Sequence, residues 1–180
     1  KGWAAARNYP ADAPRFYSDI DLAVSAEDFE NAQALLASKE SSKIGIDLHR
    51  ELRHLDTRPW PTIFETSRLI DLDGGAIRIP SPEDHLRILA VHWLNDGGES
   101  KERLWDIYCA VAAHQDSFDW DACLDGLSSN RRGWIIAAVG LANKYLGLPI
   151  NGLPFADEAR DLPNWLTATV EREWRSGVLH

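Results

Sequence analysis

An apolar run that passes directly into a helical pattern constrains the fold of this chain more than any other feature. Residues 17–24 combine aromatic and branched apolar side chains and read as a strand. Ser25 is a suitable N-cap, Asp28 stands where a capping-box acid belongs, and apolar residues then recur at helical spacing to about residue 38. A strand that is followed at once by a helix is typical of a βα unit, so we expect a sheet with helices packed on it.

The next segments continue this alternation. Residues 44–52 read as a second strand, and residues 69–79 read as a hairpin that turns at an Asp-Gly-Gly run. Trp60 stands between two prolines and is expected in a loop. The sequence therefore predicts a small mixed β-sheet with helices over residues 1–80.

Residues 81–180 follow a different pattern, because helical runs replace the strand-like ones. Ser81 and Pro82 form a strong helix start, with Ser at the cap and Pro at the first helical position. After a first helix to about residue 94, further helices are expected over residues 100–114, 119–128, 131–146 and 163–176. The sequence thus predicts an α+β fold with two domains, an α/β domain over residues 1–80 and a helical bundle over residues 81–180.

The charge balance limits the function classes. The chain has 180 residues, 44% of them hydrophobic, and a formal net charge of -9 at pH 7. Affinity for nucleic acid comes largely from Lys and Arg that neutralise phosphates, so this balance argues against a nucleic-acid partner and favours a nucleotide, a small molecule or a protein. No stretch approaches the apolar length of a membrane span, which makes a cytoplasmic location the default expectation. Cys109 and Cys123 fall in apolar helical stretches and are expected to be buried free thiols.

Three acids on the two predicted strands carry the chemistry. Asp19 and Asp21 are one residue apart, so both carboxylates should project from the same face of the first strand. Asp47 lies on the second strand, and His49, two residues further on, shares its face. A hard ion such as Mg²⁺ takes a few carboxylate oxygens and completes its shell with water and phosphate oxygens, which suits this spacing. The alternative is that these acids merely face solvent or cap the next helix.

The order of these segments resembles the nucleotidyltransferase superfamily with the polymerase-beta-like fold. Within it, the chain is similar to poorly characterised nucleotidyltransferase-like proteins of bacterial gene clusters. They share a Lys-Gly pair, here residues 1–2, before an Asp-x-Asp strand, and an Asp-Leu-His segment, here residues 47–49, after it. Their C-terminal half is helical and begins with a Ser-Pro-Glu-Asp-like entry, as this chain does at residue 81.

The resemblance implies a catalytic core over residues 1–80 followed by a C-terminal helical domain. It implies that Asp19 and Asp21 hold two divalent ions, Mg²⁺ or Mn²⁺, together with the triphosphate of an NTP. Asp47 would complete one ion site and help to deprotonate the acceptor hydroxyl. The expected reaction moves a nucleoside monophosphate from the NTP to a hydroxyl of a small molecule or a protein, and pyrophosphate leaves.

The same resemblance implies residues that bind the nucleotide. In the superfamily, a Gly at the end of the first helix lets the backbone approach the triphosphate, and Gly2 fits this position. Arg15 would pair with phosphates, although a surface ion pair with a neighbouring Asp is the alternative. The full set of expected nucleotide-binding residues is Lys1, Gly2, Arg15 and Ser18.

Three further residues are expected to be accessory. His49 would orient substrate or take part in proton transfer, and a hydrogen-bonded structural histidine is the alternative. Lys101 and Asp106 resemble the basic-then-Asp pattern with which related two-domain nucleotidyltransferases close the cleft over the nucleotide. An ordinary solvated helix face is the alternative for this pair.

The chain departs from the family pattern in its first helix and before its second strand. Trp3 and Ala4 follow the glycine where small polar residues are common, and the segment before the second strand is shorter than in the relatives, where another strand would be expected. The chain starts at Lys1 and holds no methionine, so we expect residues to be missing at the N-terminus. The short segment between residues 38 and 46 indicates either that residues are missing there as well or that the sheet is smaller than in the relatives.

These departures keep two other functions open. One is a non-catalytic regulatory module that binds nucleotide or a partner protein. The other is a toxin-like nucleotidyltransferase that acts on tRNA, against which the acidic charge counts. No short motif identifies the acceptor, the base of the NTP or the oligomeric state.

Overall fold

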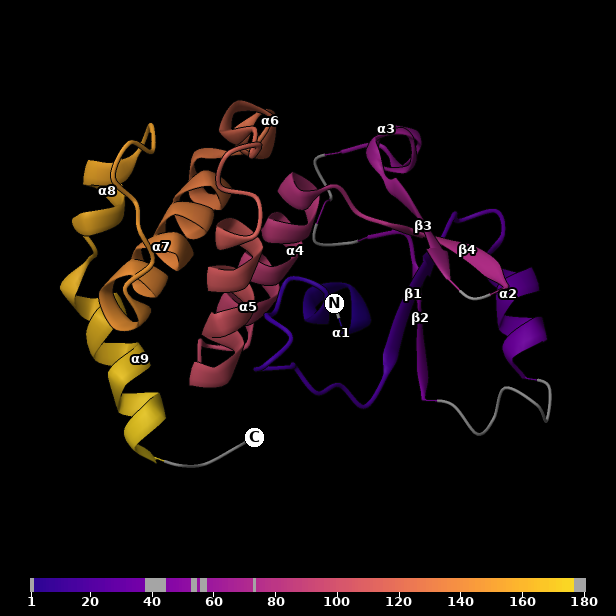
Figure 1. The fold of residues 1–180 in the computed structure, drawn as a ribbon, viewed down its shortest axis with the longest axis horizontal. Helices are drawn as coiled ribbons and strands as arrows, with labels where there is room; N and C mark the ends of the chain where they lie inside the picture. The colour runs from indigo at the N-terminus through magenta and orange to yellow at the C-terminus, as the bar shows by residue number, and fades with distance from the viewer. Residues whose placement is uncertain (1, 38–44, 53–54, 56–57, 73, 177–180) are drawn as a thin grey trace. The chain divides into compact units, whose positions relative to one another are not determined.

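The computed structural model describes residues 2–37, 45–52, 55, 58–72 and 74–176. The chain divides into two compact units, residues 1–81 and residues 82–180 (Figure 1). Among the described residues, the strands belong to the first unit and the second unit is helical. The α+β class predicted from the sequence is therefore confirmed.

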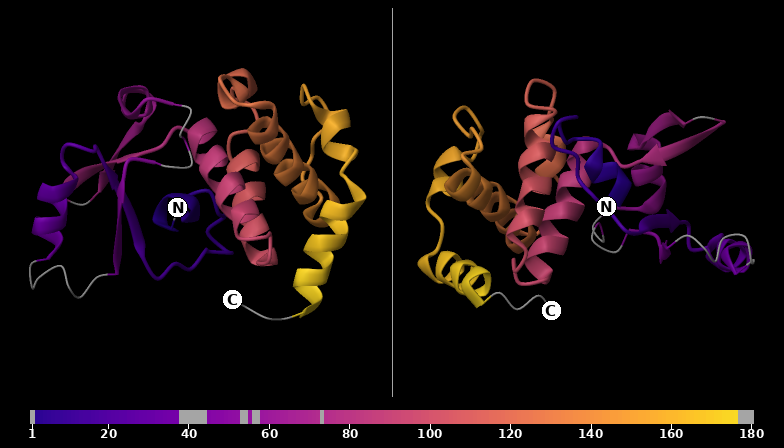
Figure 2. Two further views of the ribbon diagram at one scale, coloured as in Figure 1. Left: turned by 180° about the vertical axis from the view of Figure 1, so that it is seen from behind. Right: turned by 60° about the horizontal axis from the view of Figure 1, so that its bottom comes forward.

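A parallel strand pair forms the centre of the first unit. The elements of this unit are α1 (Gly2–Ala6), β1 (Ile20–Val24), α2 (Phe29–Leu36), β2 (Ile46–Arg50), α3 (Trp60–Thr66), β3 (Arg68–Leu72) and β4 (Gly75–Ile79). β1 and β2 pair in parallel, with α2 between them in the sequence, so the predicted βα unit extends into a βαβ unit. α1 packs against β1 and α2 against β2, and the two helices lie on opposite sides of the strand pair (Figures 1 and 2).

The hairpin predicted over residues 69–79 is confirmed as the antiparallel pair β3–β4. The parallel and antiparallel pairings that we expected in one mixed sheet lie, among the described residues, in separate sheets of two strands each. A hairpin needs only its own short connection in order to pair, whereas β1 and β2 need a long crossover. Each pairing can therefore form without the other.

The starts of β1 and α2 lie later in the chain than the sequence predicts. β1 begins at Ile20 and not at residue 17, because the ladder starts where the Ile20 N–H donates to the Gly45 carbonyl at 2.8 Å. α2 begins at Phe29 and not after Ser25. The Ser25 hydroxyl donates to the Asp28 carboxylate at 2.7 Å and accepts from the Asp28 N–H at 3.1 Å. Residues 25–28 form this turn, so the helix begins only after it.

The second unit is a helical bundle. Its elements are α4 (Pro82–Asn95), α5 (Lys101–Ala112), α6 (Trp120–Leu124), α7 (Ser129–Leu146), α8 (Ala156–Arg160) and α9 (Asn164–Ser176). α4, α5 and α7 pack on one another, and α8 packs on α7 (Figure 2). α3 and α8 were not predicted from the sequence. None of the helices in the described part of the chain is long and apolar enough to cross a membrane.

A buried arginine of α4 binds backbone carbonyls at the end of α6. Arg87 is 1% exposed, and its guanidinium donates to the carbonyls of Cys123 at 2.5 Å, Ala122 at 3.0 Å and Asp125 at 2.7 Å. The last carbonyls of a helix lack partners within the helix, so they are available to this side chain. α6 ends at Leu124, short of the predicted residue 128, because the backbone of Asp125 is extended and leaves the helix.

Candidate functional site

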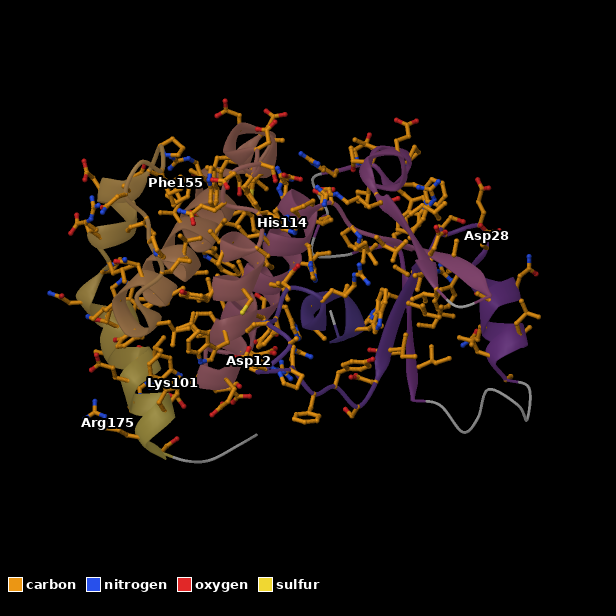
Figure 3. The ribbon with its side chains drawn as sticks, viewed as in Figure 1. Asp12, Asp28, Lys101, His114, Phe155 and Arg175 are labelled. Carbon is orange, nitrogen blue, oxygen red and sulfur yellow. The ribbon has the colours of Figure 1, made fainter. Side chains whose placement is uncertain are left out.

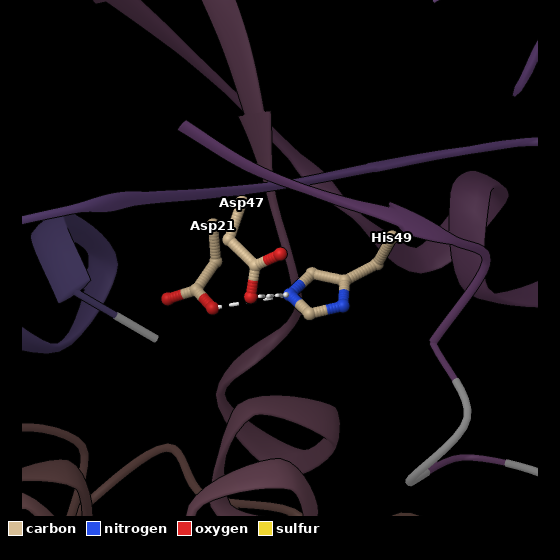
Figure 4. A group of neighbouring side chains, drawn as sticks. All are labelled: Asp21, Asp47 and His49. Carbon is tan, nitrogen blue, oxygen red and sulfur yellow. Dashed lines mark hydrogen bonds and ion pairs between the residues drawn. The ribbon is translucent and has the colours of Figure 1, made fainter. Parts of the chain in front are cut away.

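Strand register brings two aspartates face to face. β1 and β2 pair so that Asp21 and Asp47 are direct partners. Partners on neighbouring strands project from the same face, and so does His49, two residues after Asp47. The alternating residues Leu22 and Leu48 project from the other face. One face of the strand pair therefore carries the three polar side chains drawn in Figure 4.

These three side chains, which we call the acid–histidine cluster, lie close together. His49 Nε2 is 3.2 Å from Asp21 Oδ1 and 3.3 Å from Asp47 Oδ2. One potential ligand atom from each residue lies within 4.8 Å of the other two. The side chain of Asp21 is 11% exposed, that of His49 is 25% exposed and that of Asp47 is 61% exposed. Asp21 is thus the inner member of the cluster and Asp47 the outer one.

The cluster concentrates negative charge on one face of the sheet. Like charges directly opposite each other on neighbouring strands repel and destabilise the pairing. His49 can offset part of this repulsion through its contact with Asp21. Its Nε2 carries at most one hydrogen, so it cannot donate a full hydrogen bond to both carboxylates. A cation bound at this face would relieve the remaining repulsion.

The donor set fits a divalent metal ion. Mg²⁺ binds through one or two carboxylates together with the phosphates of a substrate, and Asp21 and Asp47 supply such carboxylates. Imidazole nitrogen, here from His49, is a ligand that first-row transition metals also accept. Because Asp47 is largely exposed, a phosphate-bearing ligand can reach the cluster from solvent.

Helix α1 approaches the cluster through Gly2. Gly2 is buried, and a Cβ atom at this position would lie 2.8 Å from the carbonyl oxygen of Asp19 and 3.7 Å from Asp21 Oδ2. The shorter distance is too small for a Cβ, so only glycine permits this approach of α1 to β1. This close packing is a structural reason for glycine at residue 2. It is separate from the contact with a triphosphate that the resemblance implies.

The other residues predicted at the nucleotide lie ahead of β1 in the chain. Asp19 is exposed, immediately precedes the strand and is not a member of the acid–histidine cluster. Ser18 is also exposed, and Arg15 is half-buried. Lys1 lies outside the described residues. Their roles towards cation and nucleotide stay predictions.

Lys101 and Asp106 belong to α5 in the second unit. Lys101 Nζ lies 5.5 Å from the centre of the Trp174 ring, a cation–π contact (Lys101 is labelled in Figure 3). Asp106 is only 4% exposed. Asp106 is therefore not part of a solvated helix face. The accessory role of Lys101 and Asp106 stays a prediction.

A cavity of about 540 Å³ lies in the second unit, between α6, α7 and the segment before α8. Its wall includes Phe155 (labelled in Figure 3), Asp121, Asp125 and Arg132. Arg132 is already engaged, because it donates to both carboxylate oxygens of Glu158, at 2.6 and 2.9 Å. This hydrogen-bonded pair lowers the pKa of Glu158 and raises the pKa of Arg132. None of the residues predicted to act on the nucleotide lines this cavity.

His49 was predicted from the sequence as an accessory residue of the site. In the structure it is a member of the cluster and contacts both aspartates. The signal for membership was its spacing of two residues from Asp47, which puts both side chains on one strand face. What the spacing could not supply was the neighbouring Asp21, because that contact depends on the pairing of β1 with β2.

Comparison with known proteins identifies the family. The profile of one protein family, described as "Uncharacterised nucleotidyltransferase", matches residues 1–146. The match covers the first unit, including the acid–histidine cluster, and the second unit as far as the end of α7. No curated protein and no solved structure matches the chain. The chain therefore belongs to this family of nucleotidyltransferases, which are transferases of phosphorus-containing groups.

Proposed function

We propose that this nucleotidyltransferase moves a nucleoside monophosphate from an NTP to a hydroxyl of a small molecule or a protein, with a divalent cation held at the acid–histidine cluster. The observation that carries the proposal is the direct pairing of Asp21 with Asp47 in a chain of this family. Two aligned carboxylates on one sheet face supply ligands that a cation can share with the phosphates of a nucleotide.

The exposed fractions of the two aspartates support different roles for them. Asp21, 11% exposed, is confined by its neighbours and suits a fixed cation ligand. Asp47, 61% exposed, can face an incoming acceptor, and in this proposal its carboxylate takes the proton of the acceptor hydroxyl. A bound Mg²⁺ or Mn²⁺ would neutralise charge on the phosphate oxygens as pyrophosphate leaves.

The remaining predicted residues act on the nucleotide in this proposal. Asp19 serves as a further cation ligand, and its spacing of two residues from Asp21 supports this role. The triphosphate is contacted by the segments that lead into β1, namely Lys1, Gly2, Arg15 and Ser18. Lys101 and Asp106 keep the accessory role implied by the resemblance.

One observation favours a second candidate, a non-catalytic module that binds nucleotide or a partner protein. Trp3 and Ala4 occupy positions on α1 where small polar residues would contact the triphosphate. The Arg7 guanidinium lies over the Trp3 ring, 5.0 Å from its centre, so this basic group is engaged by an aromatic ring. The tRNA-directed alternative is weaker, because a net charge of -9 opposes binding to a polyanion.

A titration of the melting temperature with metal and nucleotide tests the proposal. An NTP that binds with the cation should raise Tm only when Mg²⁺ or Mn²⁺ is present, and binding at 100 times Kd adds about 2.7 kcal/mol to the free energy of unfolding. Asp21→Asn should abolish this shift, because the amide lacks the charge that a divalent ion needs.

The matched control is Asp71→Asn, which changes an exposed aspartate on β3 of the same unit and should leave the shift intact. Identical melting with and without metal would contradict a cation site. A shift with NTP alone would favour the binding module.

A further inference from the structure

A single atom of His49, Nε2, contacts both carboxylates of the cluster. Its Nε2 is 3.2 Å from Asp21 Oδ1 and 3.3 Å from Asp47 Oδ2. Neighbouring ligands around an octahedral ion with bonds of about 2.1 Å are about 3 Å apart. The two distances from Nε2 therefore match those between neighbouring ligands of such an ion.

A hydrogen bond from His49 accounts for only one of the two contacts. The contact with Asp21, at 3.2 Å, is at the long end of the N–H···O range, and the contact with Asp47 is 3.3 Å long. A single N–H also cannot point along both directions at once. A cation held in common satisfies the nitrogen and both oxygens together, whereas a proton on Nε2 satisfies one oxygen well.

We propose that His49 is a nitrogen ligand of the divalent cation and makes this site prefer Mn²⁺ to Mg²⁺. The inference rests on the proposed function, since it requires a cation at the cluster. Mg²⁺ is a hard ion that selects oxygen ligands. Mn²⁺ also binds oxygen ligands, but as a first-row transition ion it accepts an imidazole nitrogen more readily than Mg²⁺ does. His49 thus joins Asp21 and Asp47 in the ligand set.

The test measures metal binding directly, without turnover. The full chain, without an affinity tag that carries histidines, is titrated with Mn²⁺ and with Mg²⁺ by calorimetry. Pulsed electron paramagnetic resonance of the Mn²⁺ complex then reports whether an imidazole nitrogen is coordinated. The variants are His49→Ala, which removes the donor, and His49→Glu, which offers an oxygen at similar reach.

The matched control is His92→Ala. His92 also lies near a carboxylate, with Nε2 3.5 Å from Asp96 Oδ2, but it is in α4 and outside the acid–histidine cluster. Its replacement tests whether loss of any partly buried histidine that pairs with an acid changes the metal preference.

We expect a nitrogen coupling in the wild-type Mn²⁺ complex that persists in His92→Ala and disappears in both His49 variants. The ratio of Mn²⁺ to Mg²⁺ affinity should fall by about tenfold or more in His49→Glu, because its ligand set contains only oxygen. If His49→Ala does not fold, the wild-type coupling and the His49→Glu ratio decide the question.

Two results overturn the inference in distinguishable ways. If Mn²⁺ binds and is lost in Asp21→Asn, yet the wild type shows no nitrogen coupling or the His49 variants keep the wild-type ratio, the role of His49 fails and the cation site stands. If neither ion binds, or if Asp21→Asn binds both ions as the wild type does, the cation site of the proposed function fails as well.

Discussion

Asp21 and Asp47 meet because their strands pair without a slip in register. Side chains alternate along a strand, so a shift of one residue would move Asp47 to the opposite face of the sheet. His49 would move with it, and the cluster would be lost. The site therefore depends on whatever holds β1 and β2 in this register, and the approach of α1 to the start of β1 is one such contact.

Replacement of Gly2 by alanine should disturb this contact. The added Cβ would lie 2.8 Å from the Asp19 carbonyl, so α1 must shift away from β1. Overpacking of this kind costs about 1–3 kcal/mol of unfolding free energy. We expect a lower Tm and a smaller NTP-dependent and metal-dependent shift in Gly2→Ala.

Gly75→Ala is the control in the same unit, because nothing lies within 4 Å of a Cβ at Gly75. It should change the unfolding free energy by less than about 0.5 kcal/mol. Equal effects of the two substitutions would show that the contact of α1 with β1 does not constrain the site.

At the scale of elements, α7 offers a paired test of helix packing. A Cβ at Gly140 would collide with the carbonyl oxygen of Ala159, whereas a Cβ at Gly133 on the same helix would meet open space. Both alanine variants gain helix propensity, worth up to about 1 kcal/mol. Gly140→Ala should nevertheless lose about 1–3 kcal/mol through overpacking against α8, and Gly133→Ala should gain stability.

Chemical denaturation of the two variants measures this difference. Because the propensity gain is common to both, the difference between them isolates the packing of α7 on α8. A Gly140→Ala protein as stable as Gly133→Ala would contradict the close approach of these helices.

The elements that the sequence predicts are those in which the apolar pattern repeats over many residues or in which a recognisable turn joins two strands. The hairpin and the longer helices could be read in this way, but α8 has five residues, too few to show a period. α3 begins at Trp60 beside two prolines, which read as a loop although proline is tolerated in the first turn of a helix. The pairing of β1 with β2 is a long-range choice that no local pattern encodes. The resemblance already implied that Asp21 and Asp47 share a cation site, and the local pattern placed His49 on the face of Asp47, but nothing in the sequence predicted the contact of His49 with Asp21.

At the scale of the whole molecule, buried apolar side chains are concentrated in the second unit. Among the described residues, those of the first unit are Ala5, Leu55 and Ile63, and the others belong to the helical bundle. Because apolar burial is the main favourable term in folding, the described residues of the bundle contribute more of this term than those of the first unit. The first unit exposes part of the polar face that carries the acid–histidine cluster. A ligand bound at this face would therefore stabilise the first unit.

Stability should fall at alkaline pH, in part through a thiol of the bundle. Burial raises the pKa of Cys123 from 9.0 to about 12. Above pH 9.0 the thiol ionises in the unfolded chain but stays protonated in the folded one. Its contribution to the free energy of unfolding is therefore complete below pH 9.0 and is lost as pH rises towards about 12.

Denaturant unfolding at several pH values, with a reductant present, measures this effect. The free energy of unfolding should fall more steeply with pH in the wild type than in Cys123→Ala. Tyr145, whose pKa burial raises to about 12, titrates in both proteins and cancels in the comparison. Parallel pH profiles of the two proteins would contradict the burial of the Cys123 thiol.

The most direct test of the central claim, that the acid–histidine cluster supports transfer from an NTP, is the release of labelled pyrophosphate. Each NTP is supplied with Mg²⁺ or Mn²⁺, and cell extract serves as a source of acceptors. Loss of a cation ligand removes several kcal/mol of transition-state stabilisation, so Asp21→Asn should release pyrophosphate at least about a hundredfold more slowly than the wild type. Asp71→Asn should match the wild type, and Asp47→Asn should lower turnover more than it weakens nucleotide binding. A wild-type protein that releases no more pyrophosphate than Asp21→Asn with any NTP, metal or extract would contradict the claim.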